Sequence, residues 1–269
     1  MALGDDIEAS IVTTYAGTPD PATTRSPLQR RLLRSASCAP RRPQADALEL
    51  RRPPMVPEIV LLLADDPMLL WARLEAEART HLPAPYWATA WSGGQAVARY
   101  VLDHPGLVAG RRVVDLAAGS GLVAVAAALA GASQVTANDI DPYAIAAIEA
   151  NATANDVRIR TDDRDLTGGD GGDAEVLLAG DCLYTPEVAA RMLPYAERAA
   201  ARGVTVLLGD PGRGFAPPGR LETLAIYHLP ELGAAEYGRH DQVSVLCPTP
   251  GPRAGDRPAL AEGRPDVSG

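Results

Sequence analysis

The sequence predicts an α/β fold in which helices cover both faces of a doubly wound, mostly parallel sheet. Strand-like and helical segments alternate from about residue 56 onward, and a glycine-bearing turn at 117–121 separates a strand from a helix. Two strand-like segments, 174–180 and 204–209, are almost continuously apolar. Apolar strands of this kind are typical of a sheet buried on both faces. Folds of this class bind ligands at the carboxyl ends of their strands.

The centre of the predicted fold is a strand, turn, helix and second strand between residues 113 and 142. Gly131 follows the helix and is expected to end it in a left-handed conformation. This order and length are typical of one half of a nucleotide-binding α/β unit. Its predicted parts are the strand 113–116, the turn with Gly119 and Gly121, the helix 122–129, the strand 134–138 and the acidic Asp139.

The other segments extend this unit to a seven-stranded, Rossmann-like sheet that closes with an antiparallel hairpin. Hydrophobic periodicity distinguishes the helices from the strands. The expected elements are a strand within 56–65, a helix at 67–78, a rigid loop at 83–91, helices at 95–102 and 142–155, strands at 157–160 and 174–180, a helix at 186–202, a strand at 204–209 and closing strands at 222–229 and 242–247.

A single domain is expected over residues 51–247, with 51–110 as an N-terminal lid segment. The flanking stretches 1–50 and 248–269 are rich in Ala, Pro, Gly and Arg and have no sustained periodicity, so they are predicted to be disordered tails. The arginines of the first tail form a basic patch, which we interpret as a solvated surface in preference to a binding arm.

Composition narrows the classes of function. The net charge of −9 argues against binding to nucleic acid and favours a basic partner. The three cysteines lie far apart and the four histidines are scattered, so we expect neither a disulfide framework nor a metal site. No secretory signal or long apolar run is visible, which predicts a cytoplasmic protein that does not interact with membranes. We expect a monomer.

The glycine turn favours S-adenosylmethionine over a dinucleotide. Its sequence DLAAGSG lacks the GxGxxG pattern of a NAD site, which remains the alternative. Asp115 precedes the turn and suits the positively charged amino-acid end of S-adenosylmethionine, while Gly119 and Gly121 let the backbone approach the ligand. Asp139 can accept hydrogen bonds from both ribose hydroxyls. Either acid can instead be a capping or solvent-exposed residue.

These residues carry a resemblance to a known family. VVDLAAGSG and NDIDP resemble the first two motifs of class I (seven-strand) S-adenosylmethionine-dependent methyltransferases. PYWATAWSGGQAVARYVLDHP, AGDCLY and LLGDPGR further resemble the protein-lysine methyltransferases of the electron-transfer-flavoprotein β-subunit type. The resemblance covers about residues 50–247. It departs from the family at Ala117, where the first glycine of the turn is common.

The resemblance implies methyl transfer from S-adenosylmethionine to a protein lysine, with the flavoprotein β-subunit as the leading substrate. Asp181 and Tyr184, of the D-x-x-Y motif, are the expected catalytic residues, and Tyr86 and Trp87 are expected to line the substrate channel. The expected cofactor-binding residues are Trp91, Asp115, Ala117, Gly119, Gly121, Asp139, Asp165 and Asp181. A ribosomal protein or a small amine is the alternative substrate, and a non-catalytic S-adenosylmethionine-binding protein is the alternative function.

Several of these residues have a second interpretation. The aromatic residues of 83–91 are core residues or a lid, and Asp181 is a catalytic residue or a helix cap. Asp165 is chosen for the adenine amino group from a cluster of acids that can equally form a solvated loop. Asp141 is expected to cap the following helix, and Cys182 to be a small apolar filler. The sequence leaves open whether Asp210 and Arg213 form an ion pair or contact the substrate.

Overall fold

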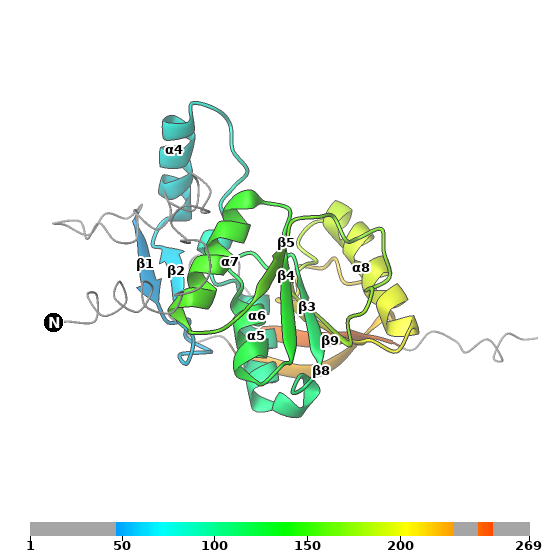
Figure 1. Ribbon diagram of the computed structural model, residues 1–269. Helices are drawn as coiled ribbons and strands as arrows, with labels where there is room; N and C mark the ends of the chain where they lie inside the picture. The colour runs from blue at the N-terminus through cyan, green and yellow to red at the C-terminus, as the bar shows by residue number, and fades with distance from the viewer. Residues whose placement is uncertain (1–46, 229–241, 250–269) are drawn as a thin grey trace, which may run out of the picture.

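The computed structural model describes residues 47–228 and 242–249, and it confirms the predicted sheet. Seven strands form one sheet in the order β5-β4-β3-β6-β7-β9-β8 (Figure 1). Strands β3 to β7 are parallel, and β9 pairs antiparallel with both β7 and β8. The predicted C-terminal hairpin is therefore present, with its second strand inserted next to β7.

The elements follow the alternation that the sequence predicts. The strands are β1 (Leu48–Arg51), β2 (Leu61–Ala64), β3 (Arg112–Leu116), β4 (Gln134–Asn138), β5 (Arg160–Asp162), β6 (Val176–Asp181), β7 (Thr205–Asp210), β8 (Leu221–His228) and β9 (Gln242–Pro248). The helices are α4 (Pro67–Ala78), η1 (Tyr86–Ala88), α5 (Ser92–Asp103), η2 (Pro105–Leu107), α6 (Leu122–Leu129), α7 (Pro142–Ala154) and α8 (Pro186–Ala201).

The strand order reverses between β3 and β6. The chain runs outward from β3 through β4 to β5 and then returns to place β6 on the other side of β3. A crevice outside the carboxyl ends of the strands forms at such a reversal and is the usual ligand site of open α/β sheets. We therefore expect the functional residues at the carboxyl ends of β3 and β6.

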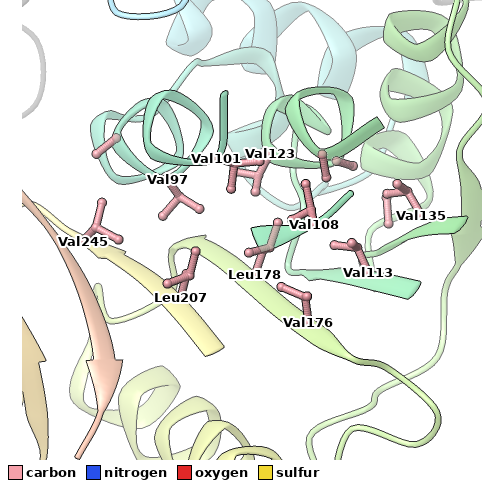
Figure 2. Close-up of a cluster of buried hydrophobic side chains, with 14 of the residues drawn as sticks. Val97, Val101, Val108, Val113, Val123, Val135, Val176, Leu178, Leu207 and Val245 are labelled. Atoms are coloured by element: carbon pink, nitrogen blue, oxygen red, sulfur yellow. The ribbon is translucent and has the colours of Figure 1, made fainter. Parts of the chain in front are cut away.

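The apolar strands alternate between two cores, one on each face of the sheet. Val176 and Leu178 of β6 face α5, α6 and α7, whereas Leu177 and Ala179 face α8. Figure 2 shows the first core, in which Val97 and Val123 from two helices lie over the strand residues. Burying each such aliphatic side chain contributes roughly 1.5–3 kcal/mol before entropy is subtracted, which explains why both faces are apolar.

The N-terminal segment forms a layer of its own over the helices. β1 and β2 make a separate antiparallel pair, which lies beside α4 and α7 in Figure 1. Carboxamides fasten it: Asn151 Oδ1 accepts a hydrogen bond from Leu62 N over 2.7 Å, and Asn155 Oδ1 accepts one from Val60 N over 2.9 Å. The segment 51–110 as a lid stays a prediction.

Four boundaries differ from the sequence-based expectation. Residues 48–50, assigned to the tail, begin β1, since they pair with β2. The strand expected within 56–65 is limited to β2 and lies outside the main sheet. The strand expected at 157–160 is β5, displaced to 160–162, where Arg160 pairs with Thr136 of β4. Apart from residues 47–50 and 248–249, both predicted tails lie outside the described residues, as does their basic patch.

The fourth difference concerns Gly93 and Gly94, which were expected to form a turn before a helix beginning at residue 95. Both lie in the first turn of α5, which begins at Ser92. The first turn of this helix packs directly against Gly180 and Gly209 at the ends of β6 and β7, where a Cβ on Gly180 would lie 3.0 Å from the Cα of Gly94. These glycines are thus explained by close packing of a helix on a sheet.

Within residues 47–228 and 242–249, no helix is both long enough and apolar enough to cross a membrane.

Candidate active site

Three predicted carboxylates lie at the carboxyl ends of neighbouring strands. Asp115 is the next-to-last residue of strand β3, Asp139 directly follows β4, and Asp181 is the last residue of β6. Because β4, β3 and β6 are adjacent and parallel, the sheet brings these side chains to one edge. The sequence-based placement of all three at this edge is thus confirmed by the topology.

The turn after β3 uses left-handed backbone at three positions. Ala117, Gly119 and Gly121 have φ angles of 52°, 53° and 77°. A Cβ on Gly121 would lie 3.1 Å from a side-chain carbon of Ile148, so this glycine lets α7 pack on the turn. A Cβ on Gly119 would have, among the described residues, only the Trp87 Cα within 4 Å, at 3.8 Å, so these residues leave this side of the turn accessible.

Asp115 combines a capping role with an unsatisfied oxygen. Its Oδ2 accepts a hydrogen bond from the N–H of Ala124, in the first turn of α6, over 2.9 Å. Its Oδ1 is buried and has no hydrogen-bond partner among the described residues. Burial raises the pKa of this carboxyl to about 8, and the negative charge of Asp139 adds to the rise. A cationic group beside Oδ1 would satisfy the oxygen and favour the ionised form.

Asp139 connects the ends of β3 and β4. Its Oδ2 accepts a hydrogen bond from Gly119 N over 2.8 Å, and its Oδ1 accepts one from Asp141 N over 3.0 Å. Burial raises its pKa, while these backbone donors oppose the rise. Each carboxylate oxygen can accept a further bond, so the group can hold two adjacent hydroxyls. Asp141 caps α7 as predicted, accepting from Tyr143 N over 2.8 Å.

Asp181 is nearly buried and is held by two donors. Its side chain is 8% exposed, Oδ2 accepts from Gly94 N over 3.2 Å, and Oδ1 accepts from Arg213 Nη2 over 3.1 Å. Burial raises the pKa of this carboxyl, and the guanidinium of Arg213 opposes that rise. The hydrogen bond from Gly94 supports the interpretation of Asp181 as a cap of α5, and its catalytic role stays a prediction. Arg213 thus forms its ion pair with Asp181, and contact of Asp210 or Arg213 with the substrate stays a prediction.

An aromatic cluster of Tyr86, Trp91 and Tyr184 lies beside this pair. The ring centroids of Tyr86 and Trp91 are 5.9 Å apart, and so are those of Tyr86 and Tyr184. The Trp91 indole donates to the Tyr86 carbonyl over 2.8 Å, and the Arg213 guanidinium lies 5.6 Å from the Trp91 ring centroid. Tyr86 is 55% exposed and Tyr184 38%, so this cluster faces solvent and can contact a partner.

Trp87 differs from its neighbours. It is 2% exposed, belongs to the core cluster that contains Leu70 and Ala147, and stacks on Tyr143 at a centroid distance of 6.3 Å. These contacts favour the interpretation of Trp87 as a core aromatic over that of a channel residue. It lies close to the site only through its backbone, next to Gly119.

Asp165 is engaged by a helix on the other side of its loop. Its carboxylate accepts from the Thr167 hydroxyl over 2.6 Å and pairs with Arg191 of α8. These partners lower its pKa, the Thr167 hydroxyl contributing most. Its role in adenine binding stays a prediction. Asn138, which the sequence did not single out, is 3% exposed and donates to the Asp162 carbonyl over 2.8 Å, fastening this loop to the end of β4.

Two further features, a buried cysteine and a cavity, are not assigned to the binding of cofactor or substrate. Cys182 is buried and its pKa is raised to about 12 by burial, so the thiol stays protonated, as expected of an apolar filler. A cavity of about 270 Å³ lies by the amino end of β7, opposite the carboxylates, and has a mainly aliphatic lining that includes Leu107, Val204 and Leu224.

Comparisons with known proteins agree with the geometry. A family model described as ribosomal protein L11 methyltransferase (PrmA) matches residues 100–179, from α5 to β6. A protein of Xenopus laevis named electron transfer flavoprotein beta subunit lysine methyltransferase is 39% identical over 181 residues, covering 66% of this chain and 72% of that protein. The Danio rerio protein of the same name is 40% identical over 163 residues, covering 59% of this chain and 62% of that protein.

Proposed function

We propose that this chain, which belongs to the family of electron transfer flavoprotein beta subunit lysine methyltransferases, methylates a lysine of that beta subunit. Family membership implies methyl transfer from S-adenosylmethionine to the side chain of a protein lysine. The chain spans 72% of the Xenopus relative but about three-fifths of the Danio rerio and Rattus norvegicus relatives. The beta subunit is the substrate in their names, and its assignment to this chain is part of the proposal.

The observation that carries the proposal is the arrangement of two acids around one glycine turn. Asp139 accepts from the N–H of Gly119, and the charge of Asp139 acts on Asp115, whose buried Oδ1 has no hydrogen-bond partner among the described residues. These residues fit S-adenosylmethionine, since Asp139 can hold the ribose hydroxyls and Asp115 the positive amino-acid end. Gly119 leaves the backbone accessible between them. We assign Trp91 a position at the edge of the same ligand.

S-adenosylmethionine, when bound, supplies a methyl group on a positively charged sulfur, which an uncharged amine takes by direct displacement. A lysine is mostly protonated at pH 7, and supplying the neutral form costs about 4–5 kcal/mol. We assign the removal of water to Tyr86 and Tyr184, because an excluded, partly apolar site lowers the pKa of an amine. Asp181 would then hold the nitrogen by a hydrogen bond and align it.

A ribosomal protein remains the second candidate substrate, because the L11 methyltransferase model matches residues 100–179. That match includes Asp115 and Asp139 but ends before Asp181 and Arg213. The match therefore supports the binding of S-adenosylmethionine, and it does not include the residues that we assign to the methyl-accepting lysine.

Incubation of the protein with radiolabelled S-adenosylmethionine and a lysate of the source cell tests the proposal. We expect a labelled protein band of the size of the beta subunit, and label that is confined to RNA or to a ribosomal protein would refute the beta subunit as substrate. Since this proposal places the cofactor on Asp115 and Asp139 and gives Asp181 the acceptor nitrogen in place of the cofactor contact expected from the sequence, the Asp181→Asn variant should still bind S-adenosylmethionine. It should lose about 10- to 100-fold in kcat/KM, the value of a hydrogen bond to a charged group. Asp173→Asn, at an 86% exposed side chain, is the matched control.

A further inference from the structure

The carboxylate of Asp181 and the ring of Trp91 together form a site for a cation. A buried carboxylate needs a positive partner, and an aromatic face attracts one. Here the partner comes from the chain itself, because Arg213 places Nη2 3.1 Å from Asp181 Oδ1 and its guanidinium carbon 5.6 Å from the Trp91 centroid. The rings of Tyr86 and Tyr184 adjoin it.

We propose that Arg213 is an internal stand-in for the substrate's lysine, occupying the acceptor subsite until the protein substrate displaces it. The proposal rests on the function proposed above, in which Asp181 holds the lysine nitrogen. Both cations would use the same carboxylate and the same aromatic surface, so they compete for one place. An arginine there does not serve as the acceptor that the displacement requires, since its guanidinium stays protonated.

The contacts of Arg213 are those of a group that can leave. Its pairing with Asp181 uses one hydrogen bond, not the bidentate geometry that makes arginine–carboxylate pairs strong. Its Nε is buried and has no hydrogen-bond partner among the described residues. It lies in the loop 211–220, between β7 and β8, where no helix or strand has to move with it.

Exchange of one cation for another also limits the cost of displacement. Leaving the carboxylate of Asp181 without Arg213 in its nearly buried position is unfavourable, because only the backbone of Gly93 and Gly94 then interacts with it among the described residues. Arg213 is therefore expected to leave mainly when an incoming lysine replaces its charge. Amines that bring no further binding energy from a protein surface would displace it poorly.

The composition of the chain provides a sharp test. The sequence contains no lysine, so Arg213→Lys introduces the single lysine of the molecule and places an amine at the proposed subsite. In its neutral form this nitrogen would form a bond to the methyl carbon. The electron pair of the carbon–sulfur bond would pass to sulfur, leaving S-adenosylhomocysteine, and the extra proton on nitrogen would pass to water.

We expect the Arg213→Lys variant, incubated with S-adenosylmethionine alone, to become methylated at residue 213, as detected by tandem mass spectrometry. Arg220→Lys is the matched control, because Arg220 pairs with Glu197 at a surface position and its lysine should stay unmodified. An unmodified residue 213 in a preparation that still methylates the beta subunit would overturn the proposal. Methylation of residue 213 would support the subsite, and a beta subunit that the wild-type protein leaves unmodified would separately reject that substrate.

If Arg213→Lys is misfolded and fails to bind S-adenosylmethionine, the Arg213→Met variant tests the proposal instead. Without the internal cation, the KM for the protein substrate should fall roughly tenfold, because apparent affinity is reduced by the fraction of molecules with the site open. A KM that is unchanged or higher, with a lower kcat, would identify Arg213 as a support for Asp181 and overturn the proposal.

Discussion

The N–H of Gly119 donates a hydrogen bond to Asp139 Oδ2 over 2.8 Å, which fastens the turn after β3 to the end of β4. We propose the same carboxylate for the ribose hydroxyls, so in this proposal it both orders the turn and binds the ligand. We therefore expect a substitution of Asp139 to lower the affinity for S-adenosylmethionine more than it lowers the free energy of unfolding.

Asp139→Ala should weaken binding of S-adenosylmethionine at least about tenfold, because one lost hydrogen bond to a charged group costs about 1.5–3 kcal/mol. Isothermal titration of the variant measures this directly. Asp173→Ala, at a side chain that is 86% exposed, is the control and should bind normally. Equal affinity in both variants would remove Asp139 from the cofactor site.

Asp115 predicts a dependence of stability on pH. Its pKa is about 8 in the folded protein and near 3.8 when unfolded, so the folded state binds the extra proton between these values. Its stabilising contribution is therefore complete below about pH 4 and is lost as pH rises toward 8, by up to about 1.4 kcal/mol per pH unit.

Asp115→Asn should flatten this slope, although Asp139, whose pKa is also raised, contributes in the same direction. Denaturant unfolding at pH 5 and pH 8, without cofactor, compares the two proteins. As the pH rises from 5 to 8, the free energy of unfolding should fall less for Asp115→Asn than for the wild type. Parallel curves would show that Asp115 is not the buried group responsible.

Ala117 carries a conformation that favours glycine. Its φ of 52° is costly for an L-residue, by roughly 1–2 kcal/mol, and part of that cost is recovered when the side chain is removed. Ala117→Gly should raise the free energy of unfolding by about 1 kcal/mol without weakening cofactor binding. Ala118→Gly, at a neighbour without positive φ, should lower it, and a stabilised control would argue against backbone strain as the cause.

The glycine contact between α5 and β7 predicts a link from packing to catalysis. A Cβ on Gly209 would overlap the carbonyl of Gly93, and α5 would have to shift. Gly209→Ala should therefore destabilise the fold by about 1–3 kcal/mol and move the Gly94 N–H away from Asp181, lowering methyl transfer. Thermal melting and activity check this against Gly168→Ala, where a Cβ meets nothing within 4 Å. An intact Gly209→Ala enzyme would contradict the packing.

The sequence predicted those parts of the molecule that local pattern determines. The unit from β3 to β4 has the expected boundaries to within one residue, because its apolar runs and its glycine turn are contiguous in the chain. Asp115, Asp139 and Asp181 were placed correctly, since strands of a parallel sheet end at one edge. The bounds expected for β5, 157–160, were wrong by two to three residues, because pairing with β4, and not hydrophobicity, defines this strand.

Contacts between distant segments were beyond sequence reasoning. The pairing of Arg213 with Asp181 joins residues separated by 32 positions, and nothing local selects it over a pairing with Asp210. Trp87 and Trp91 are both tryptophans of the same segment, yet of these two only Trp87 is buried, where it stacks on Tyr143. The residue type therefore does not distinguish the core tryptophan from the other one. The strand β1 was missed because its partner β2 lies outside the main sheet.

The most direct measurement of the central claim uses purified components. The protein is incubated with S-adenosylmethionine and the isolated beta subunit of electron transfer flavoprotein, and the subunit is then analysed by mass spectrometry. Methyl groups on a lysine of the beta subunit, absent with Asp181→Asn, are the predicted result. A beta subunit that remains unmodified, while the protein binds S-adenosylmethionine with normal affinity, would contradict it.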